Sequence, residues 1–265
     1  MASEHAVVIL EQPKNNKKFF VKIARTCEDS GRILREINVL RKLRELKVDN
    51  IPEIVLSGKI QGRAYLVENY IDQSKNRRLT ETNMLSYILD WLGKFYSQTK
   101  QGTIDPKQIV HRAEEVAKLA NGFVDLTDSL YILEKSVPNI PIPAVCRHGD
   151  IADINFVFSN QGMVGIDFGF SRFNEPPSEP HALVCANKLM AAAKSVDVLS
   201  ELNEINPFFF AIYENITRLG EELEMLNELE KNLSVINRIR YFVPQVQLSK
   251  IEHLRMCYQV QSTKT

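Results

Sequence analysis

The sequence lacks a long hydrophobic run. None of its apolar stretches approaches the roughly 20 residues that a membrane-spanning helix requires. The first residues, MASEHAVVILEQ, carry an early glutamate and no hydrophobic region of the kind found in signal peptides. We therefore expect a cytoplasmic protein without a membrane partner.

The sequence also has no net charge. The 33 Lys and Arg residues balance the 33 Asp and Glu residues, so no overall basic field favours binding to nucleic acid or to an anionic membrane. We interpret the short basic clusters at residues 14–18 and 75–78 as solvated loops. Nucleic acid is therefore not expected as a partner, and a charged ligand must be recognised by a local group of side chains.

The four cysteines form no Cys-x-x-Cys pair. They are scattered along the chain at Cys27, Cys146, Cys185 and Cys257. This spacing argues against a cysteine-based zinc site and against a disulfide framework. We expect all four to be buried, reduced thiols.

The pattern of apolar residues changes along the 265-residue chain, which is long enough for one large core or two modest ones. Residues 5–24 predict a hairpin of two strands, residues 30–47 an amphipathic helix, and residues 51–71 two further strands. The polar stretch 72–79 is the predicted linker, because from residue 80 onward the pattern is mostly helical. The predicted fold class is α+β.

Two charged residues stand out in the first part of the chain. Lys22 lies alone among apolar neighbours in the predicted strand FFVKIA, where a lone charge is costly unless it is paired or directed at a ligand. Glu36 follows Ile33 by three residues and precedes Leu40 by four, so it shares the apolar face of the predicted helix. We predict that Glu36 pairs with Lys22 and that Lys22 reaches the α and β phosphates of a nucleotide.

The segment CRHGDIADINFVF, residues 146–158, places polar side chains beside an apolar run. Asp150 lies on a loop, where a carboxylate is suited to accept a hydrogen bond from a substrate hydroxyl and to orient it for attack. Asp167 ends the next apolar run, where a carboxylate is suited to hold Mg²⁺, and Asn155 would supply a neutral oxygen ligand. His148 is expected to hold the loop through hydrogen bonds.

These residues, in this order, resemble the protein-kinase-like superfamily, and most closely its aminoglycoside phosphotransferase and choline kinase branch. The matching pieces are Lys22 on a strand, Glu36 on the following helix, HGDIADIN for the family's His-x-Asp-x-x-x-x-Asn loop, and IDFG for its metal-binding Asp. The resemblance extends over residues 5–185. The C-terminal helices carry no motif that matches the family.

The resemblance implies a bilobal kinase that uses ATP and Mg²⁺ and transfers phosphate to a hydroxyl of a small molecule. Residues 1–71 would form an N-terminal nucleotide-binding lobe with a small antiparallel sheet and one helix. Residues 80–265 would form a mainly helical C-terminal lobe with the catalytic loop and the acceptor site. The implied site residues fall into three groups: catalytic Asp150 and Asn155, nucleotide-binding Lys22, Glu36, Glu68 and Tyr70, and metal-binding Asn155 and Asp167.

The sequence departs from the protein kinases in two places. The first hairpin turn, LEQPKNNKKF, contains no glycine, whereas protein kinases use a glycine-rich loop to bring backbone amides close to the phosphates. Phosphate contacts would then come from Asn15, Asn16 or the nearby lysines. The segment SRFNEPPSEP after Gly169 reaches the next helix quickly, so a small-molecule pocket is favoured over a peptide-binding platform.

Three functions remain open on the sequence. The first is a phosphotransferase that acts on a hydroxyl of a sugar, an amino alcohol or a similar metabolite, and Asp72, Glu175 and Glu179 are candidates for an entrance that favours a cationic substrate. The second is an atypical small protein kinase or ATPase, similar to those in tRNA-modification complexes. The third is a non-catalytic binding module, which does not explain why the complete set of site residues is present.

Overall fold

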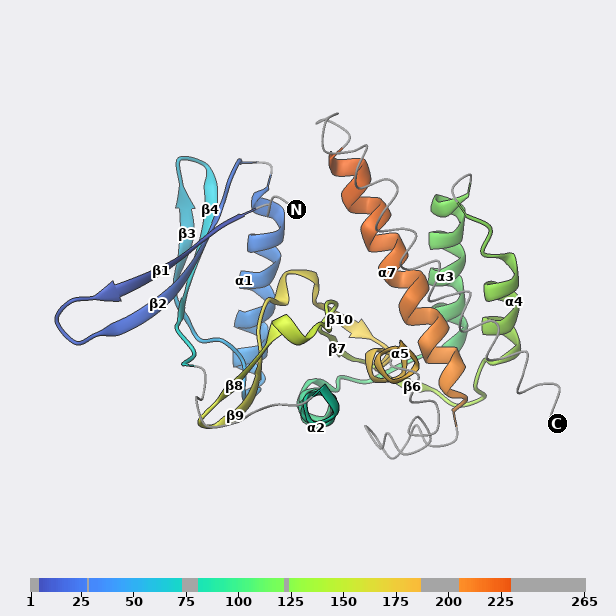
Figure 1. Cartoon of the computed structure of the whole chain (residues 1–265). Coiled ribbons are helices and arrows are strands. Elements are labelled where there is room, and N and C mark those ends of the chain that lie inside the picture. Colours follow the sequence, from blue (N-terminus) through green and yellow to red (C-terminus); the bar gives the residue numbers. More distant parts are fainter. Residues whose placement is uncertain (1–4, 28, 73–80, 122–123, 187–204, 230–265) are drawn as a thin grey trace. The chain divides into compact units, whose positions relative to one another are not determined.

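The computed structural model divides the chain into two compact units (Figure 1). The first contains Met1–Lys100 and Cys146–Phe173, and the second contains Gln101–Val145 and Asn174–Thr265. The structure describes residues 5–27, 29–72, 81–121, 124–186 and 205–229.

The predicted linker at 72–79 lies almost entirely outside the described residues, so a division into lobes at that point stays a prediction. The two compact units follow a different grouping, because the segment from Cys146 to Phe173, with the predicted catalytic loop, belongs to the same unit as the N-terminal sheet. The chain changes unit within strands β7 (Val145–Arg147) and β10 (Arg172–Glu175).

The first unit contains an antiparallel sheet in the order β1-β2-β4-β3. Its strands are β1 (His5–Gln12), β2 (Lys17–Ala24), β3 (Ile54–Ile60) and β4 (Arg63–Asn69). Both predicted hairpins are confirmed. In the second, Gln61 and Gly62 have φ angles of 50° and 78°, which is the left-handed conformation that a two-residue hairpin turn of type I′ requires.

Helix α1 (Ser30–Glu45) begins directly after Thr26 and Asp29, whose side chains each accept from the other's backbone N–H. The backbone N–H of Thr26 donates to Asp29 Oδ2 at 3.0 Å, and that of Asp29 donates to Thr26 Oγ1 at 3.1 Å. The helix buries Glu36 on a face that is otherwise apolar. A buried carboxylate on such a face requires a partner of opposite charge.

Trp91 packs against several aromatic residues in the remainder of the first unit. Helix α2 (Glu81–Thr99) places its indole 4.7 Å from the ring of Phe95 and 5.3 Å from that of Phe156, between ring centroids. Strand β9 (Gly162–Gly165) pairs with β8 (Phe156–Ser159) and approaches the indole through Gly165, where a Cβ would lie 2.5 Å from Trp91. Glycine is therefore the residue that allows this close contact.

The second unit is mainly helical, as the sequence predicts. Its described helices are α3 (Pro106–Ala120), α4 (Thr127–Lys135), α5 (Glu179–Ala186) and α7 (Pro207–Leu229), and the strands β5 (Thr103–Ile104) and β6 (Ile142–Pro143) pair with each other. Asp105 caps α3 by accepting from the Lys107 N–H at 3.0 Å. Phe208, Phe209 and Phe210 are buried in the core of this unit.

Several sequence expectations are corrected. Cys27 is exposed, whereas Cys146 is buried as expected; the side chains of the other two cysteines lie outside the described residues. Glu175 and Glu179 are buried, and Glu175 contacts Arg112 at 3.3 Å and Tyr213 at 3.0 Å. Neither carboxylate lines an open entrance.

In the described part of the chain, no helix has the length and apolar character needed to cross a membrane.

Candidate active site

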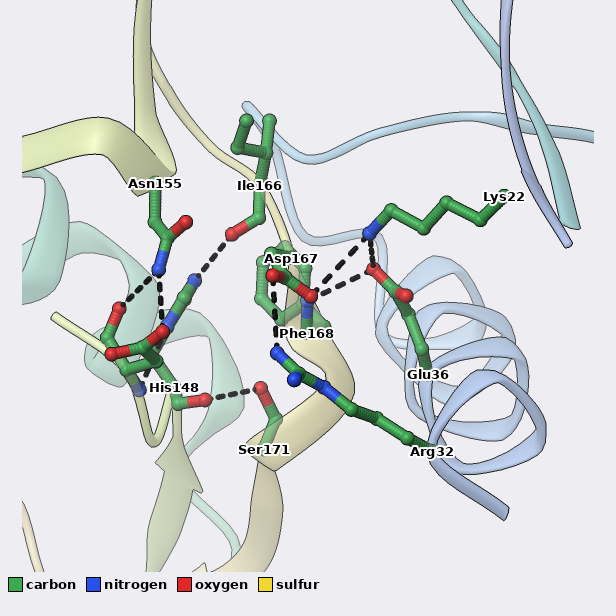
Figure 2. A network of polar contacts seen from close by, with 10 residues as sticks. Lys22, Arg32, Glu36, His148, Asn155, Ile166, Asp167, Phe168 and Ser171 are labelled. Atoms are coloured by element: carbon green, nitrogen blue, oxygen red, sulfur yellow. Dashed lines mark hydrogen bonds and ion pairs between the residues drawn. The ribbon is translucent and has the colours of Figure 1, made fainter. Parts of the chain in front are cut away.

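Lys22 and Glu36 form the predicted ion pair (Figure 2). Strand β2 places Lys22 between Val7 of β1 and Leu66 of β4, and its Nζ lies 2.7 Å from Glu36 Oε1. Both residues are almost fully buried, with 4% and 1% of their surfaces exposed. The sheet and α1 therefore hold a charged pair in the interior of the first unit.

The charge of Lys22 is maintained by its surroundings. Burial alone would lower the pKa of its ammonium group, but Glu36, Asp167 and Glu68 outweigh burial and raise this pKa. A second carboxylate is within reach, because Lys22 Nζ lies 3.4 Å from Asp167 Oδ1. The lysine thus links the helix to the segment that carries Asp167.

Asp167 is held in a left-handed conformation, with φ 61° and ψ 68°. Its neighbours are fixed by hydrogen bonds from distant elements. The N–H of Phe168 donates to Glu36 Oε1 at 3.0 Å, and the N–H of Ile166 donates to the backbone carbonyl of Asn155 at 2.9 Å. This conformation is unusual for a residue other than glycine, and such local strain is often found at functional sites.

The carboxylate of Asp167 is contacted by two cations. Oδ1 faces Lys22, and Oδ2 lies 3.2 Å from Nη2 of Arg32 on α1. Burial would raise the pKa of Asp167, but Lys22 and Arg32 together lower it. Asp167 is therefore ionised in the folded protein at neutral pH.

His148 holds the loop that carries Asp150 through hydrogen bonds, as we expected. Its Nε2 lies 3.0 Å from the carbonyl oxygen of Ile166, and its Nδ1 lies 3.4 Å from the backbone N–H of Asp150. Complete burial lowers its pKa to about 4, so the ring is neutral at pH 7, with Nε2–H donating and Nδ1 accepting. Ser171 fixes the same loop by donating from Oγ to the His148 carbonyl at 2.6 Å.

Asp150 and Asn155 lie on the two sides of one loop. The amide Nδ2 of Asn155 donates to Asp150 Oδ2 at 2.8 Å and to the Asp150 carbonyl at 3.0 Å. Asn155 itself ends the short 3₁₀ turn η1 (Asp153–Asn155). Asp153 is exposed and accepts only from the adjacent Ile154 N–H among its described contacts, which agrees with a purely local role.

The donor set at Asp167 and Asn155 fits Mg²⁺ chemically. Proteins usually hold Mg²⁺ through one or two carboxylates, together with water and substrate phosphates. Asp167 supplies a carboxylate, and Asn155, whose Nδ2 is used by Asp150, retains its side-chain oxygen as a ligand. The described residues contain no group of three or more His, Cys, Asp or Glu that would hold a metal ion, so phosphate oxygens would have to complete the coordination.

Glu68 and Tyr70, the other two residues predicted to bind the nucleotide, differ in their placement. Glu68 is buried on β4, on the same face as Leu66, and its side chain interacts electrostatically with Glu36 and Lys22. Tyr70 follows the strand; its N–H donates to the Lys18 carbonyl at 3.2 Å, and its ring lies 5.9 Å from Lys18 Nζ. Glu68 thus joins the network around Lys22, whereas the described contacts of Tyr70 are with Lys18.

The expected role of the first hairpin turn is wrong. Gln12 pairs with Lys17 at the turn, whereas Val7 pairs with Lys22, so the turn is separated from Lys22 by about 17 Å of strand. Figure 1 shows the turn at the outer end of the hairpin, away from α1. Asn15 and Asn16 are therefore not placed to contact a phosphate beside Lys22.

Sequence reasoning missed Arg32. A signal for it exists, because Arg32 precedes Glu36 by one helical turn and residues at this spacing share a helix face. Its partner Asp167 is 135 positions away, so the contact itself is visible only in the folded chain. His5 was also missed; burial and the nearby Lys22 lower its pKa.

No protein-family model matches the chain, and no curated protein matches it. Solved structures do match, and they show that the chain has the bilobal protein-kinase-like fold predicted above, in the form found in choline kinase and aminoglycoside phosphotransferases.

One such structure is the choline kinase LicA from Streptococcus pneumoniae, with a TM-score of 0.61, 18% identity, and coverage of 95% of this chain and 91% of that chain. LicA in complex with AMP gives a TM-score of 0.56, with 17% identity over 96% of this chain and 94% of that chain. The GDP complex of aminoglycoside 2'-phosphotransferase-IIIa gives a TM-score of 0.58, with 15% identity over 97% of this chain and 94% of that chain.

Proposed function

We propose that this chain is a phosphotransferase that uses ATP and Mg²⁺ and transfers the γ-phosphate to a hydroxyl of a small molecule. One observation carries the proposal: a single compact unit contains the buried pair of Lys22 and Glu36, the carboxylate of Asp167, and the loop of Asp150 and Asn155. The similar structures include a choline kinase and an aminoglycoside phosphotransferase, solved with AMP and with GDP.

In the proposed complex, Lys22 binds the α and β phosphates through its ammonium group. Glu36 keeps this group in place, since it lies 2.7 Å from Nζ and is itself held by the Phe168 N–H. Mg²⁺, held by Asp167 and Asn155, would neutralise the charge of the phosphates. Glu68 and the following residues as far as Tyr70 would lie beside the adenine.

Asp150 acts on the acceptor. Its carboxylate accepts a hydrogen bond from the acceptor hydroxyl and receives the proton as the acceptor oxygen bonds to the γ-phosphorus. The bond from that phosphorus to the oxygen bridging to the β-phosphate breaks, and ADP leaves. Asn155 orients the carboxylate and the neutral His148 holds the backbone of Asp150. Orientation is the main requirement because phosphoryl transfer depends on positioning and charge neutralisation.

The segment after Asp167 supports a small acceptor. Strand β10 and then helix α5, which begins at Glu179, follow Gly169 closely. Protein kinases instead place a long activation segment at this point. A small-molecule acceptor is therefore favoured over a peptide.

The test combines binding with turnover. Mg²⁺ and ATP together should raise the melting temperature, because a ligand that binds only the folded state stabilises it. ADP release should then be measured with a panel of sugars, amino alcohols and aminoglycosides. With the acceptor that responds, Asp150→Ala should lower turnover by about 10²- to 10⁴-fold while nucleotide binding persists.

Asp153→Ala is the matched control, because it removes a carboxylate three residues along the same loop that is exposed and bonds only locally. It should retain turnover. Undiminished turnover in Asp150→Ala would disprove the role of Asp150. The absence of any thermal shift at millimolar nucleotide would instead favour a non-catalytic module.

A further inference from the structure

Arg32 forms an ion pair with Asp167, whose carboxylate is the Mg²⁺ ligand in the proposed function. Its Nη2 lies 3.2 Å from Asp167 Oδ2, and Lys22 contacts the other oxygen. Both oxygens of the proposed metal ligand are therefore used by protein cations (Figure 2). Binding of a metal to Asp167 must loosen at least one of these contacts.

Lys22 and Arg32 differ in whether they keep a carboxylate partner when the contact with Asp167 is lost. Lys22 is held more tightly by Glu36, at 2.7 Å, than by Asp167, at 3.4 Å, so it keeps a carboxylate partner when Asp167 is engaged elsewhere. The described contacts of Arg32 include no other carboxylate than that of Asp167. Loss of the Asp167 contact would thus leave the guanidinium of Arg32 as the uncompensated charge in the site.

The fold nevertheless keeps this guanidinium in place. Its central carbon lies 4.0 Å from the centroid of the Phe170 ring, which is a favourable cation–π distance. The absent side chain of Gly169 makes room, since a Cβ there would lie 2.6 Å from Arg32 Nε. Arg32 Nε is buried and has no hydrogen-bond partner among the described residues, so part of its donor capacity is unused.

The site also needs a phosphate-binding group that is not backbone. The glycine-free turn of the first hairpin lies at the far end of β1 and β2 from Lys22, so it does not supply amides to the phosphates. Arginine presents a rigid fork of donors that matches the oxygens of a phosphate and stays charged at all relevant pH values. Arg32 is therefore the described group with the right chemistry beside Asp167.

We propose that Arg32 binds the phosphates of the nucleotide, and that it moves from Asp167 to the phosphates when the metal–nucleotide complex occupies the site. This inference rests on the proposed function. It makes α1 a source of two groups for the same site, Glu36 for the lysine and Arg32 for the nucleotide. In the nucleotide-free protein, the contact with Asp167 keeps Arg32 ordered and close to its ligand.

Equilibrium binding tests the inference without requiring turnover. Dissociation constants for Mg²⁺–ATP and for adenosine should be measured by calorimetry for the wild type, Arg32→Ala and Arg32→Lys. Arg32→Ala should weaken Mg²⁺–ATP binding at least tenfold, since hydrogen bonds to charged groups contribute about 1.5–3 kcal/mol, and should leave adenosine binding within twofold. Arg32→Lys should recover part of the loss.

Arg35→Ala is the control, because it removes the same charge from the same helix at an exposed position. Its binding constants should match those of the wild type. Unchanged or tighter Mg²⁺–ATP binding in Arg32→Ala would overturn the inference and show that Arg32 only covers Asp167. An equal loss of adenosine binding would overturn it in favour of a purely structural role. If the wild type binds no nucleotide, the proposed function itself fails.

Discussion

The pair of Lys22 and Glu36 shares its surroundings with a third buried group, the carboxyl of Glu68. Only 4% of Glu68 is exposed, and its Oε1 has no hydrogen-bond partner among the described residues. Burial, and secondarily the charge of Glu36, raises the pKa of Glu68 to about 8, although Lys22 opposes this shift. Glu68 is therefore mostly protonated near pH 7, and the charge balance of the site depends on pH.

This raised pKa predicts a pH-dependent stability. An unfolded chain loses the Glu68 proton near pH 4.5, whereas the folded protein keeps it up to about pH 8. The folded state therefore holds an additional proton within this window, and its stability falls as the pH rises through it, by up to about 1.4 kcal/mol per pH unit. Glu68→Gln has no such proton, so its stability relative to the wild type should increase from pH 5 to pH 8.

Urea unfolding at several pH values measures this difference. Glu45→Gln is the matched control at an exposed position on α1, and its stability relative to the wild type should not depend on pH. A difference between Glu68→Gln and the wild type that stays constant from pH 5 to pH 8 would show that Glu68 is ionised in the folded protein.

At the scale of elements, the loop that carries Asp150 depends on one glycine. Gly149 has φ 90°, and a Cβ there would lie 2.4 Å from the backbone oxygen of Phe170. A left-handed conformation costs other residues about 1–2 kcal/mol, and this contact with backbone adds to that cost. The glycine between His148 and Asp150 therefore allows the loop to pass close to the segment after Asp167.

We expect Gly149→Ala to lower the free energy of unfolding by about 3 kcal/mol or more, which is typical of a substitution that combines backbone strain with a steric clash. Gly102→Ala is the control, because Gly102 has a similar φ of 75° and a Cβ added there would meet no atom within 4 Å. It should cost only about 1–2 kcal/mol. Equal losses in the two variants, measured by denaturant unfolding, would contradict the steric part of this account.

The sequence predicted most elements because local patterns determine them. Alternating and helical spacing located the four strands of the sheet and α1. The start of helix α4 at Thr127 was not located from the apolar pattern. Its N-cap residue, Leu126, makes no side-chain cap bond, but Oδ1 of the preceding Asp125 accepts from the Thr127 N–H at 2.9 Å, so Asp125 is the local signal for this boundary.

At the scale of the whole molecule, contacts between residues far apart in the sequence could be predicted only for the residues of a recognisable motif. Lys22, Glu36 and Asp167 do come together. The contact of Arg32 with Asp167 was missed, because it depends on how α1 packs against a segment more than a hundred positions away. The turn at Asn15 and Asn16 was misplaced, because proximity in sequence to Lys22 was taken for proximity in space, whereas an extended strand separates them.

The grouping of the site residues predicts where nucleotide binding stabilises the chain. Lys22, Arg32, Glu36 and the segment Cys146–Phe173 all belong to the first unit. Mg²⁺–ATP at about 100 times its dissociation constant should stabilise this unit by about 2.7 kcal/mol. Some amides exchange only when the unit opens and releases the ligand. Hydrogen exchange at these amides should therefore slow by roughly 100-fold.

Hydrogen-exchange mass spectrometry with and without Mg²⁺–ATP locates this effect. Peptides from β2, α1 and residues 146–170 should be protected, whereas those from α3 and α7 of the second unit should change little. Asp167→Ala should lose the protection, because it removes the proposed metal ligand. Since the same experiment reports on both units, protection confined to α3 and α7 would place the nucleotide in the second unit and contradict the site built around Lys22 and Asp167.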